Sequence, residues 1–162
     1  PPADVVSWLN QYFEQMSICI AEEKGLVNKF IGDAILAVFG APVPLENHAE
    51  SAVRAGIKMR DSAKNLSKEF LQKDLPALKI RIGIHSGKVL AGNIGSMTRL
   101  EYTVIGDTVN IASRLESHCK EAGKDLLITE NTKSHLNDLF QTESIGKIQV
   151  RGRESEIGIY SL

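Results

Sequence analysis

The middle of the chain most constrains its fold, because short apolar runs, glycines and a helix pattern follow one another there. Arg81–Gly95 reads RIGIHSGKVLAGNIG, and Glu101–Ser117 reads EYTVIGDTVNIASRLES. This pattern predicts a strand, a glycine-rich segment, a second strand that stops at Gly106, and then a helix. Asn110 and Arg114 are four residues apart. This spacing places an amide and a guanidinium on one face of the predicted helix.

Asn110 and Arg114 together are suited to holding a nucleotide. Arg presents a fixed fork of donors for phosphate oxygens, and Asn can hydrogen-bond a sugar oxygen or a base edge. The alternative is that Arg114 only caps a surface helix and that Asn110 has no special task. A second motif upstream favours the nucleotide interpretation.

That second motif, LVNKFIGDAILAVFG over Leu26–Gly40, predicts a β-hairpin. Two β-rich runs flank Gly32 and Asp33, and Gly or Asp at such a junction is typical of a hairpin turn. The carboxylate of Asp33, with Lys29 four residues before it, is a candidate Mg²⁺ ligand beside bound phosphates. The alternative is that Asp33 serves the turn alone, by hydrogen-bonding its own backbone.

Together these segments resemble the class III nucleotidyl cyclase catalytic domain, the family of adenylyl and guanylyl cyclases. The resemblance is carried by KFIGDAILAVFG, RIGIHSGKVLAGNIG, YTVIGDTVNIASRLE and, near the end, VRGR (Val150–Arg153), in the family's order and spacing. It covers nearly the whole chain and implies a ferredoxin-like core. It also implies conversion of ATP to cyclic AMP and pyrophosphate, assisted by two Mg²⁺ or Mn²⁺ ions per site.

The resemblance implies a task for each residue of the site. Asp33 is expected to bind metal, Asn110 to orient the ribose and Arg114 to stabilise charge at the α-phosphate. Arg81 is expected to contact phosphate, and Arg151, where the family often has Lys, to contact the terminal phosphates. Considered alone, Arg81 could equally be exposed on its strand or paired with a carboxylate.

Base choice is expected to depend on Lys29 and Thr103. In the family, cyclases that use ATP commonly pair Lys with Asp or Thr at these positions, whereas guanylyl cyclases carry Glu and a small residue such as Cys. Lys29 can donate to adenine N1, and the Thr103 hydroxyl can accept from the 6-amino group. ATP is therefore the expected substrate. Thr at this position resembles a bacterial and bicarbonate-responsive branch, which raises bicarbonate as an effector.

Composition is that of an ordinary domain. The 162 residues, 43% of them hydrophobic, are enough for one well-buried core, and the length favours a single domain over 1–162. The net charge of −1 argues against a general binder of nucleic acid or membrane surfaces. No apolar run reaches the ~20 residues of a membrane span and no signal peptide is visible, so a cytoplasmic domain is expected, within a parent protein that could be anchored. Cys19 and Cys119 lack CxxC spacing and are expected to be core or surface thiols.

Helix and strand patterns alternate along the chain, which predicts an α+β sandwich with a mostly antiparallel sheet. Helices are predicted over Asp4–Glu22, Asn47–Leu71, Asp107–Lys120 and Asn131–Asn137. Strands are predicted over Leu26–Ile31, Ala34–Phe39, Leu78–His85, Lys88–Asn93, Tyr102–Ile105, Leu126–Thr129, Phe140–Ile145 and Glu156–Leu162.

The family carries a strand with a second metal-binding Asp before the first helix, and this chain begins at Pro1, on that helix. We therefore expect the N-terminal strand to be missing and the fragment alone to be inactive, because two-metal chemistry needs ligands for both ions. Activity of the fragment would mean that another carboxylate, such as Asp107, takes the second ion. The functional unit is expected to be a homodimer, since the family's metal-binding and base-binding residues come from opposite protomers.

Three alternatives remain beside an active adenylyl cyclase. One is a catalytically inactive cyclase-like domain that binds a nucleotide or partner and regulates its parent protein. Another is a guanylyl cyclase. The third is a relative of diguanylate cyclases or polymerase palms, which would need an acidic GGDEF-like hairpin where this chain reads FIGDA.

Overall fold

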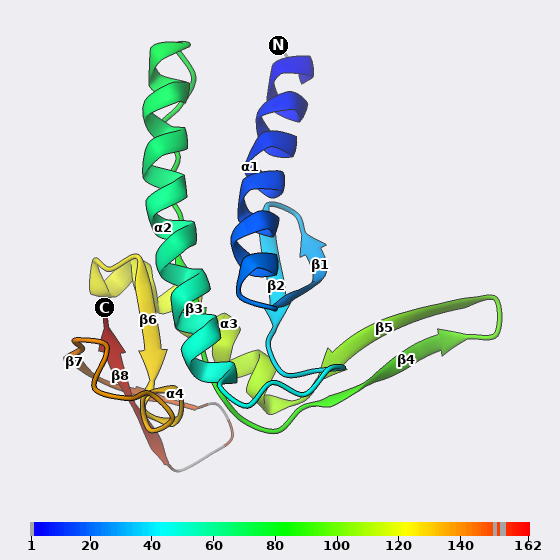
Figure 1. Ribbon diagram of the computed structural model, residues 1–162, viewed down its shortest axis with the longest axis vertical. Helices are drawn as coiled ribbons and strands as arrows, with labels where there is room; N and C mark the ends of the chain where they lie inside the picture. The colour runs from blue at the N-terminus through cyan, green and yellow to red at the C-terminus, as the bar shows by residue number, and fades with distance from the viewer. Residues whose placement is uncertain (1, 151, 153–154) are drawn as a thin grey trace. The chain divides into compact units, whose positions relative to one another are not determined.

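The computed structural model describes residues 2–150, 152 and 155–162. The chain divides into two units, of which the first comprises Pro1–Phe39 and Ser51–Ile80 and the second Gly40–Glu50 and Arg81–Leu162. Each unit has its own β-structure (Figure 1). Within the described ranges, no helix is long and apolar enough to cross a membrane.

The first unit consists of two helices and a hairpin. It contains α1 (Pro2–Glu22), β1 (Leu26–Ile31), β2 (Ala34–Val38) and α2 (His48–Gln72) from Ser51 onward. Apolar residues recur at helical spacing along both helices, as in other amphipathic helices. The following side chains from them are almost completely buried: Met16, Ile20, Val53, Ala63, Leu66 and Phe70.

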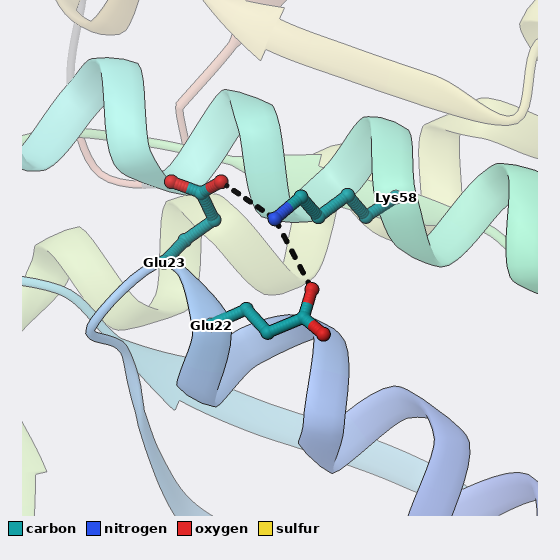
Figure 2. A network of polar contacts seen from close by, with 3 residues as sticks. All are labelled: Glu22, Glu23 and Lys58. Carbon is teal, nitrogen blue, oxygen red and sulfur yellow. Dashed lines mark hydrogen bonds and ion pairs between the residues drawn. The ribbon is translucent and has the colours of Figure 1, made fainter.

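Two contacts fix the direction of α1 against α2. Trp8, in the first half of α1, packs on Phe70 near the end of α2, with ring centroids 5.4 Å apart. At the other end, the Lys58 ammonium of α2 lies 2.9 Å from a Glu23 carboxylate oxygen and 3.1 Å from one of Glu22 (Figure 2). Hydrogen bonds to Glu23 and then Glu22 raise the pKa of Lys58 above its ordinary value. The two helices therefore run antiparallel.

The hairpin is held directly on α1. Phe13 of α1 packs on Phe30 of β1, with ring centroids 4.5 Å apart. Between the two elements, a Cβ atom at Gly25 would lie 2.5 Å from the Phe39 ring and 2.8 Å from Ile20. A larger residue at position 25 would have to displace the Phe39 ring or the Ile20 side chain, so the connection between α1 and β1 is tightly packed.

The second unit contains a four-stranded sheet in the order β3-β6-β8-β7. β3 (Ile82–Ile84) pairs parallel with β6 (Leu126–Thr129). β8 (Glu156–Ser161) pairs antiparallel with β6 and with β7 (Glu143–Gln149). All four residues of β6 are buried, as is typical of an inner strand.

Helix α3 (Asp107–Ala122) packs on this sheet. Its buried residues Leu115 and Cys119 form a cluster with Leu127 of β6 and Ile159 of β8. Burial in that cluster raises the pKa of the Cys119 thiol to about 11. Cys119 is therefore a core residue rather than a surface thiol, and Cys19 of α1 is buried as well.

Gly83 allows α3 to approach β3 closely. A Cβ atom at this position would lie 2.5 Å from the backbone nitrogen of Glu116 and 2.7 Å from the carbonyl oxygen of Ala112. Real Cβ atoms do not come so near a backbone, so any other residue would push the helix off the strand.

The remaining elements of the second unit are a hairpin and a short helix. Among the described residues, β4 (Leu90–Ser96) and β5 (Arg99–Ile105) pair only with each other, antiparallel. In Figure 1 this hairpin extends away from the four-stranded sheet. α4 (Glu130–Lys133) follows β6, and the Thr129 side chain caps it by accepting a hydrogen bond from Thr132 N.

The predicted α+β class with mostly antiparallel pairing is confirmed, although the strands form three sheets and β3 pairs parallel. The strand predicted over Leu78–His85 is only three residues long. One reason is that the backbone N–H of Leu78 donates to the Ser67 hydroxyl at 2.9 Å and is not available to a strand ladder. The helix predicted over Asn131–Asn137 is shortened to Glu130–Lys133, and the strand predicted over Phe140–Ile145 begins later, at Glu143.

Candidate functional site

The turn between β1 and β2 presents Asp33. Ile31 pairs with Ala34, so Gly32 and Asp33 form the two-residue turn, and Gly32 has the positive φ of 61° that such turns favour. Asp33 is exposed. Its carboxylate makes no hydrogen bond or ion pair within the described part of the chain. The alternative in which Asp33 bonds only its own backbone is therefore not what the structure shows.

Lys29 lies on the same hairpin and is also exposed. It pairs with Leu36 after a bulge, since the register of β1 shifts between Val27 and Lys29. No described carboxylate pairs with its ammonium group. The hairpin thus offers one anionic and one cationic side chain, both available to a ligand.

The donor set at the hairpin suits a metal held partly by its substrate. Among the described residues, no three His, Cys, Asp or Glu side chains gather into a metal-binding group. Mg²⁺ in proteins is usually bound by one or two carboxylates together with substrate phosphates, not by an all-protein cage. An exposed carboxylate without a partner, such as that of Asp33, fits this mode of binding.

Thr103 lies in the middle of β5 and has an unusual hydroxyl group. Its Oγ1 atom is buried, yet no described donor or acceptor reaches it. Gly92 is its cross-strand partner on β4, and a Cβ atom there would meet nothing within 4 Å. Buried hydroxyls almost always have a partner. The Thr103 hydroxyl is therefore a candidate for a hydrogen bond to a bound molecule.

Helix α3 carries Asn110 and Arg114 one turn apart, as the spacing predicted. Both side chains are exposed, and neither makes a hydrogen bond or ion pair with a described residue. Arg81, the residue before β3, is exposed and forms no ion pair within the same ranges. Of the two alternatives expected for Arg81, the structure shows the exposed position and no carboxylate partner among the described residues. Arg151 lies outside the described residues.

The start of α3 is fixed to the loop that follows β3. The Thr108 hydroxyl donates to the carbonyl oxygen of Lys88 at 2.6 Å. A Cβ atom at Gly87 would lie 2.7 Å from the same hydroxyl, so the loop passes directly beside Thr108. These contacts hold the turn of α3 from which Asn110 projects.

The same loop is anchored at its other end by polar groups that no local sequence pattern predicts. His85 Nδ1 lies 2.7 Å from the hydroxyl of Thr129, and the Ser86 hydroxyl lies 2.9 Å from that of Thr132. The Thr132 hydroxyl also donates to the carbonyl oxygen of Ile84 at 3.3 Å. Both threonines are fully buried, so this is an interior network. The only hint in the sequence is the three-residue spacing of Thr129 and Thr132.

The expected site residues are distributed over both units. Lys29 and Asp33 lie on the hairpin of the first unit. Arg81, Thr103, Asn110 and Arg114 belong to the second unit. Within the second unit, α3 brings Asn110 and Arg114 together.

Comparisons with known proteins identify the family of this chain. The family model "Adenylate and Guanylate cyclase catalytic domain" matches residues 1–162. Adenylate cyclase 1 of Rhizobium meliloti is 33% identical over 161 residues, which cover 99% of this chain and 24% of that protein. The adenylate cyclase of Anabaena cylindrica is 34% identical over 168 residues, covering 99% of this chain and 32% of that protein. The chain thus spans about a quarter to a third of these relatives.

Solved structures give the same result for the fold. A guanylyl cyclase crystal structure superimposes with a TM-score of 0.90 and 31% identity, covering 99% of this chain and 81% of that chain. The adenylyl cyclase CyaB from P. aeruginosa gives a TM-score of 0.88 and 34% identity, with 98% and 82% covered. The α+β architecture is that of cyclase catalytic domains. The family model, the relatives and the fold agree, and this chain belongs to the family of adenylate and guanylate cyclase catalytic domains.

Proposed function

We propose that this chain is the catalytic domain of an adenylyl cyclase, which converts ATP to 3′,5′-cyclic AMP and pyrophosphate, and that residues 1–162 act as one catalytic domain. The observation that carries nucleotide binding is the buried Thr103 hydroxyl, which has no partner among the described residues. Because a Thr hydroxyl can both donate and accept, the choice of ATP over GTP would depend chiefly on Lys29. The adenine 6-amino group would supply the missing hydrogen bond. Relatives named adenylate cyclase support this choice, whereas the guanylyl cyclase structure keeps GTP as the second candidate.

Base selection would combine Thr103 with Lys29. The Lys29 ammonium can only donate, and adenine N1 is an acceptor. Guanine presents N1–H at the corresponding position, so a donor would face a donor. Leaving buried polar groups unpaired is an effective way to reject the wrong base.

The reaction would be an intramolecular displacement. The ribose 3′-oxygen attacks the α-phosphorus, the bond to the bridging oxygen of pyrophosphate breaks, and the 3′-hydroxyl proton is released. Asn110 would hydrogen-bond the ribose and hold the attacking oxygen in line. The Arg114 guanidinium would stabilise the negative charge that develops on the α-phosphate. Arg81 and Arg151 would contact the phosphates.

Asp33 would hold Mg²⁺ or Mn²⁺, with two ions per site as is common for this chemistry. When bound, these ions would make the 3′-oxygen a better nucleophile and neutralise the leaving phosphates. The exposed, unpaired carboxylate of Asp33 supports this assignment, since it has no other task among the described residues.

The active form would be a homodimer with two equivalent sites. Each site would combine Asp33 and Arg81 of one copy with Lys29, Thr103, Asn110 and Arg114 of the other copy. Bicarbonate would be an effector, a proposal supported only by the Thr at position 103. Comparing initial rates with and without bicarbonate at constant pH tests that point.

Two assays on the full-length protein test the proposal. Initial rates with ATP should exceed those with GTP, and a preference for GTP would replace the adenylyl assignment by the guanylyl one. For the shared site, Asp33→Ala and Asn110→Ala proteins are each assayed alone and then mixed. One of the two sites in the mixed dimer holds both intact residues, so partial recovery is expected. Failure of every mixture, beside an active wild type, would reject shared sites.

A further inference from the structure

A groove runs between α3 and β7 in the second unit, and Arg114 lines it. Its volume is about 450 Å³. Like Arg114, the other lining residues belong to α3 or β7: Ser113, Ser117, His118, Glu121, Lys147, Ile148 and Gln149. Arg114 is expected at the α-phosphate, so the groove begins where the proposed reaction takes place.

The helix period of α3 and the alternation of side chains along β7 determine which side chains line the groove. On α3, Ser113, Ser117 and Glu121 are successive residues four apart, which places them along one face of the helix. On β7, Ile148 packs into the core clusters. Lys147 and Gln149 on either side of it therefore point away from that core, because side chains alternate along a strand.

The groove has a surplus of hydrogen-bond donors and positive charge. Arg114 and Lys147 form no ion pair with a described residue. Glu121, its one carboxylate, lies 3.5 Å from His118 Nδ1. Two cations from different elements, together with serine hydroxyls, match the oxygen-rich surface of a phosphate group. The chain as a whole has a net charge of −1 and so carries no excess of cations. The surplus of positive charge in the groove is therefore a local feature.

We propose that this groove binds a diphosphate group, with Lys147 as a phosphate-binding residue beside Arg114. The inference rests on the proposed function, which makes pyrophosphate the product and puts Arg114 next to the bond that releases it. The diphosphate is either free pyrophosphate on its way out or the β- and γ-phosphates of bound ATP. In both cases the Lys147 ammonium neutralises charge that Arg114 alone leaves uncompensated.

The direct test is calorimetric titration of the full-length protein with inorganic pyrophosphate. Lys147→Met should weaken binding about tenfold, as expected for loss of a charged hydrogen-bond donor. Lys120→Met is the matched control, because Lys120 is an exposed lysine on α3 that does not line the groove. It should bind pyrophosphate like the wild type. Thermal unfolding of both variants checks that the fold is intact.

The ATP assay then separates the two sources of the diphosphate. A raised inhibition constant for pyrophosphate with an unchanged KM for ATP indicates a product site, whereas a raised KM indicates the substrate's own phosphates. If Lys147→Met behaves like Lys120→Met in calorimetry and in both kinetic constants, or if the wild type binds no pyrophosphate, the inference is wrong. Loss of pyrophosphate binding in a protein that makes no cyclic AMP would support the groove and reject the proposed function.

Discussion

The hairpin turn that carries Asp33 and the helix that carries Asn110 and Arg114 are held in opposite ways. The Asp33 turn is exposed, and its carboxylate has no partner among the described residues. The start of α3 is fixed by Thr108, which bonds the loop after β3, and that loop is fixed in turn by buried hydroxyls. The protein therefore fixes in advance the positions of the residues proposed to contact the ribose and the α-phosphate. It leaves the carboxylate proposed to bind metal to be ordered by its ligands.

The largest effect is expected at the exposed turn. Asp33→Ala should lower kcat for cyclic AMP formation by at least about a thousandfold, since a lost metal site removes several kcal/mol of transition-state stabilisation. The melting temperature should stay within about 1 °C, because exposed side chains without contacts contribute little to stability. Asp61→Ala, at an exposed Asp of α2 in the same unit, is the control and should change neither value. A large drop in melting temperature for Asp33→Ala would show that the turn is structurally braced after all.

A smaller change is expected in base selectivity. Lys29→Glu combined with Thr103→Cys should shift the ratio of ATP to GTP turnover by about a hundredfold toward GTP, because hydrogen bonds in a buried site contribute ~1–3 kcal/mol each. The measurement is kcat/KM for both nucleotides. An unchanged ratio would remove both residues from the base site. Thr103→Ser, which keeps the hydroxyl, should retain the preference for ATP.

The hydroxyl group of Thr108 tests whether the loop contact positions the start of α3. Thr108→Val keeps the shape of the side chain but cannot donate to Lys88 O, and loss of one hydrogen bond of ~1 kcal/mol should lower kcat about fivefold with little change in KM. Thr108→Ser restores the donor and should restore kcat. If both variants retain wild-type kcat, the loop contact does not position Asn110, and the contrast with the hairpin turn is weaker than proposed.

The smallest effect concerns the buried Cys119 thiol on the core-facing side of α3. Burial raises the pKa of Cys119 from 9.0 to about 11 and raises that of Cys19 as well. The neutral thiol is thus favoured by folding, so stability from Cys119 is complete below pH 9 and is lost as the pH rises through about 11. At pH 8 a disulfide reagent should label neither cysteine in the native protein and both after denaturation. Rapid native labelling of Cys119 would show that the packing of α3 on the sheet opens readily.

Sequence patterns could predict those parts of the site that depend on local spacing. Four-residue separation placed Asn110 and Arg114 on one face of a helix, and the Gly32-Asp33 pair between β-rich runs predicted the hairpin turn. Both features are set by the backbone period or by turn chemistry within a few residues. For the same reason the α+β class could be predicted from the alternation of patterns.

Features that depend on distant pairings could not be predicted in this way. His85 meets Thr129 across a separation of 44 residues, and that contact exists because β3 pairs with β6. The groove beside Arg114 needs α3 and β7 to pack together, which no short pattern specifies. At Leu78 the local pattern predicted a strand that does not form. The backbone N–H of Leu78 instead donates to the Ser67 side chain, a contact that the pattern does not indicate.

The contact at Gly83 has a consequence for how this domain tolerates sequence change. There the helix rests on the backbone of β3 itself, with no side chain between them. The separation of helix and strand is therefore set by peptide groups, which every amino-acid sequence shares, and not by the volume of core residues. Neighbouring core positions can exchange one apolar residue for another while Asn110 and Arg114 stay at nearly the same height above the sheet, so long as position 83 carries no side chain.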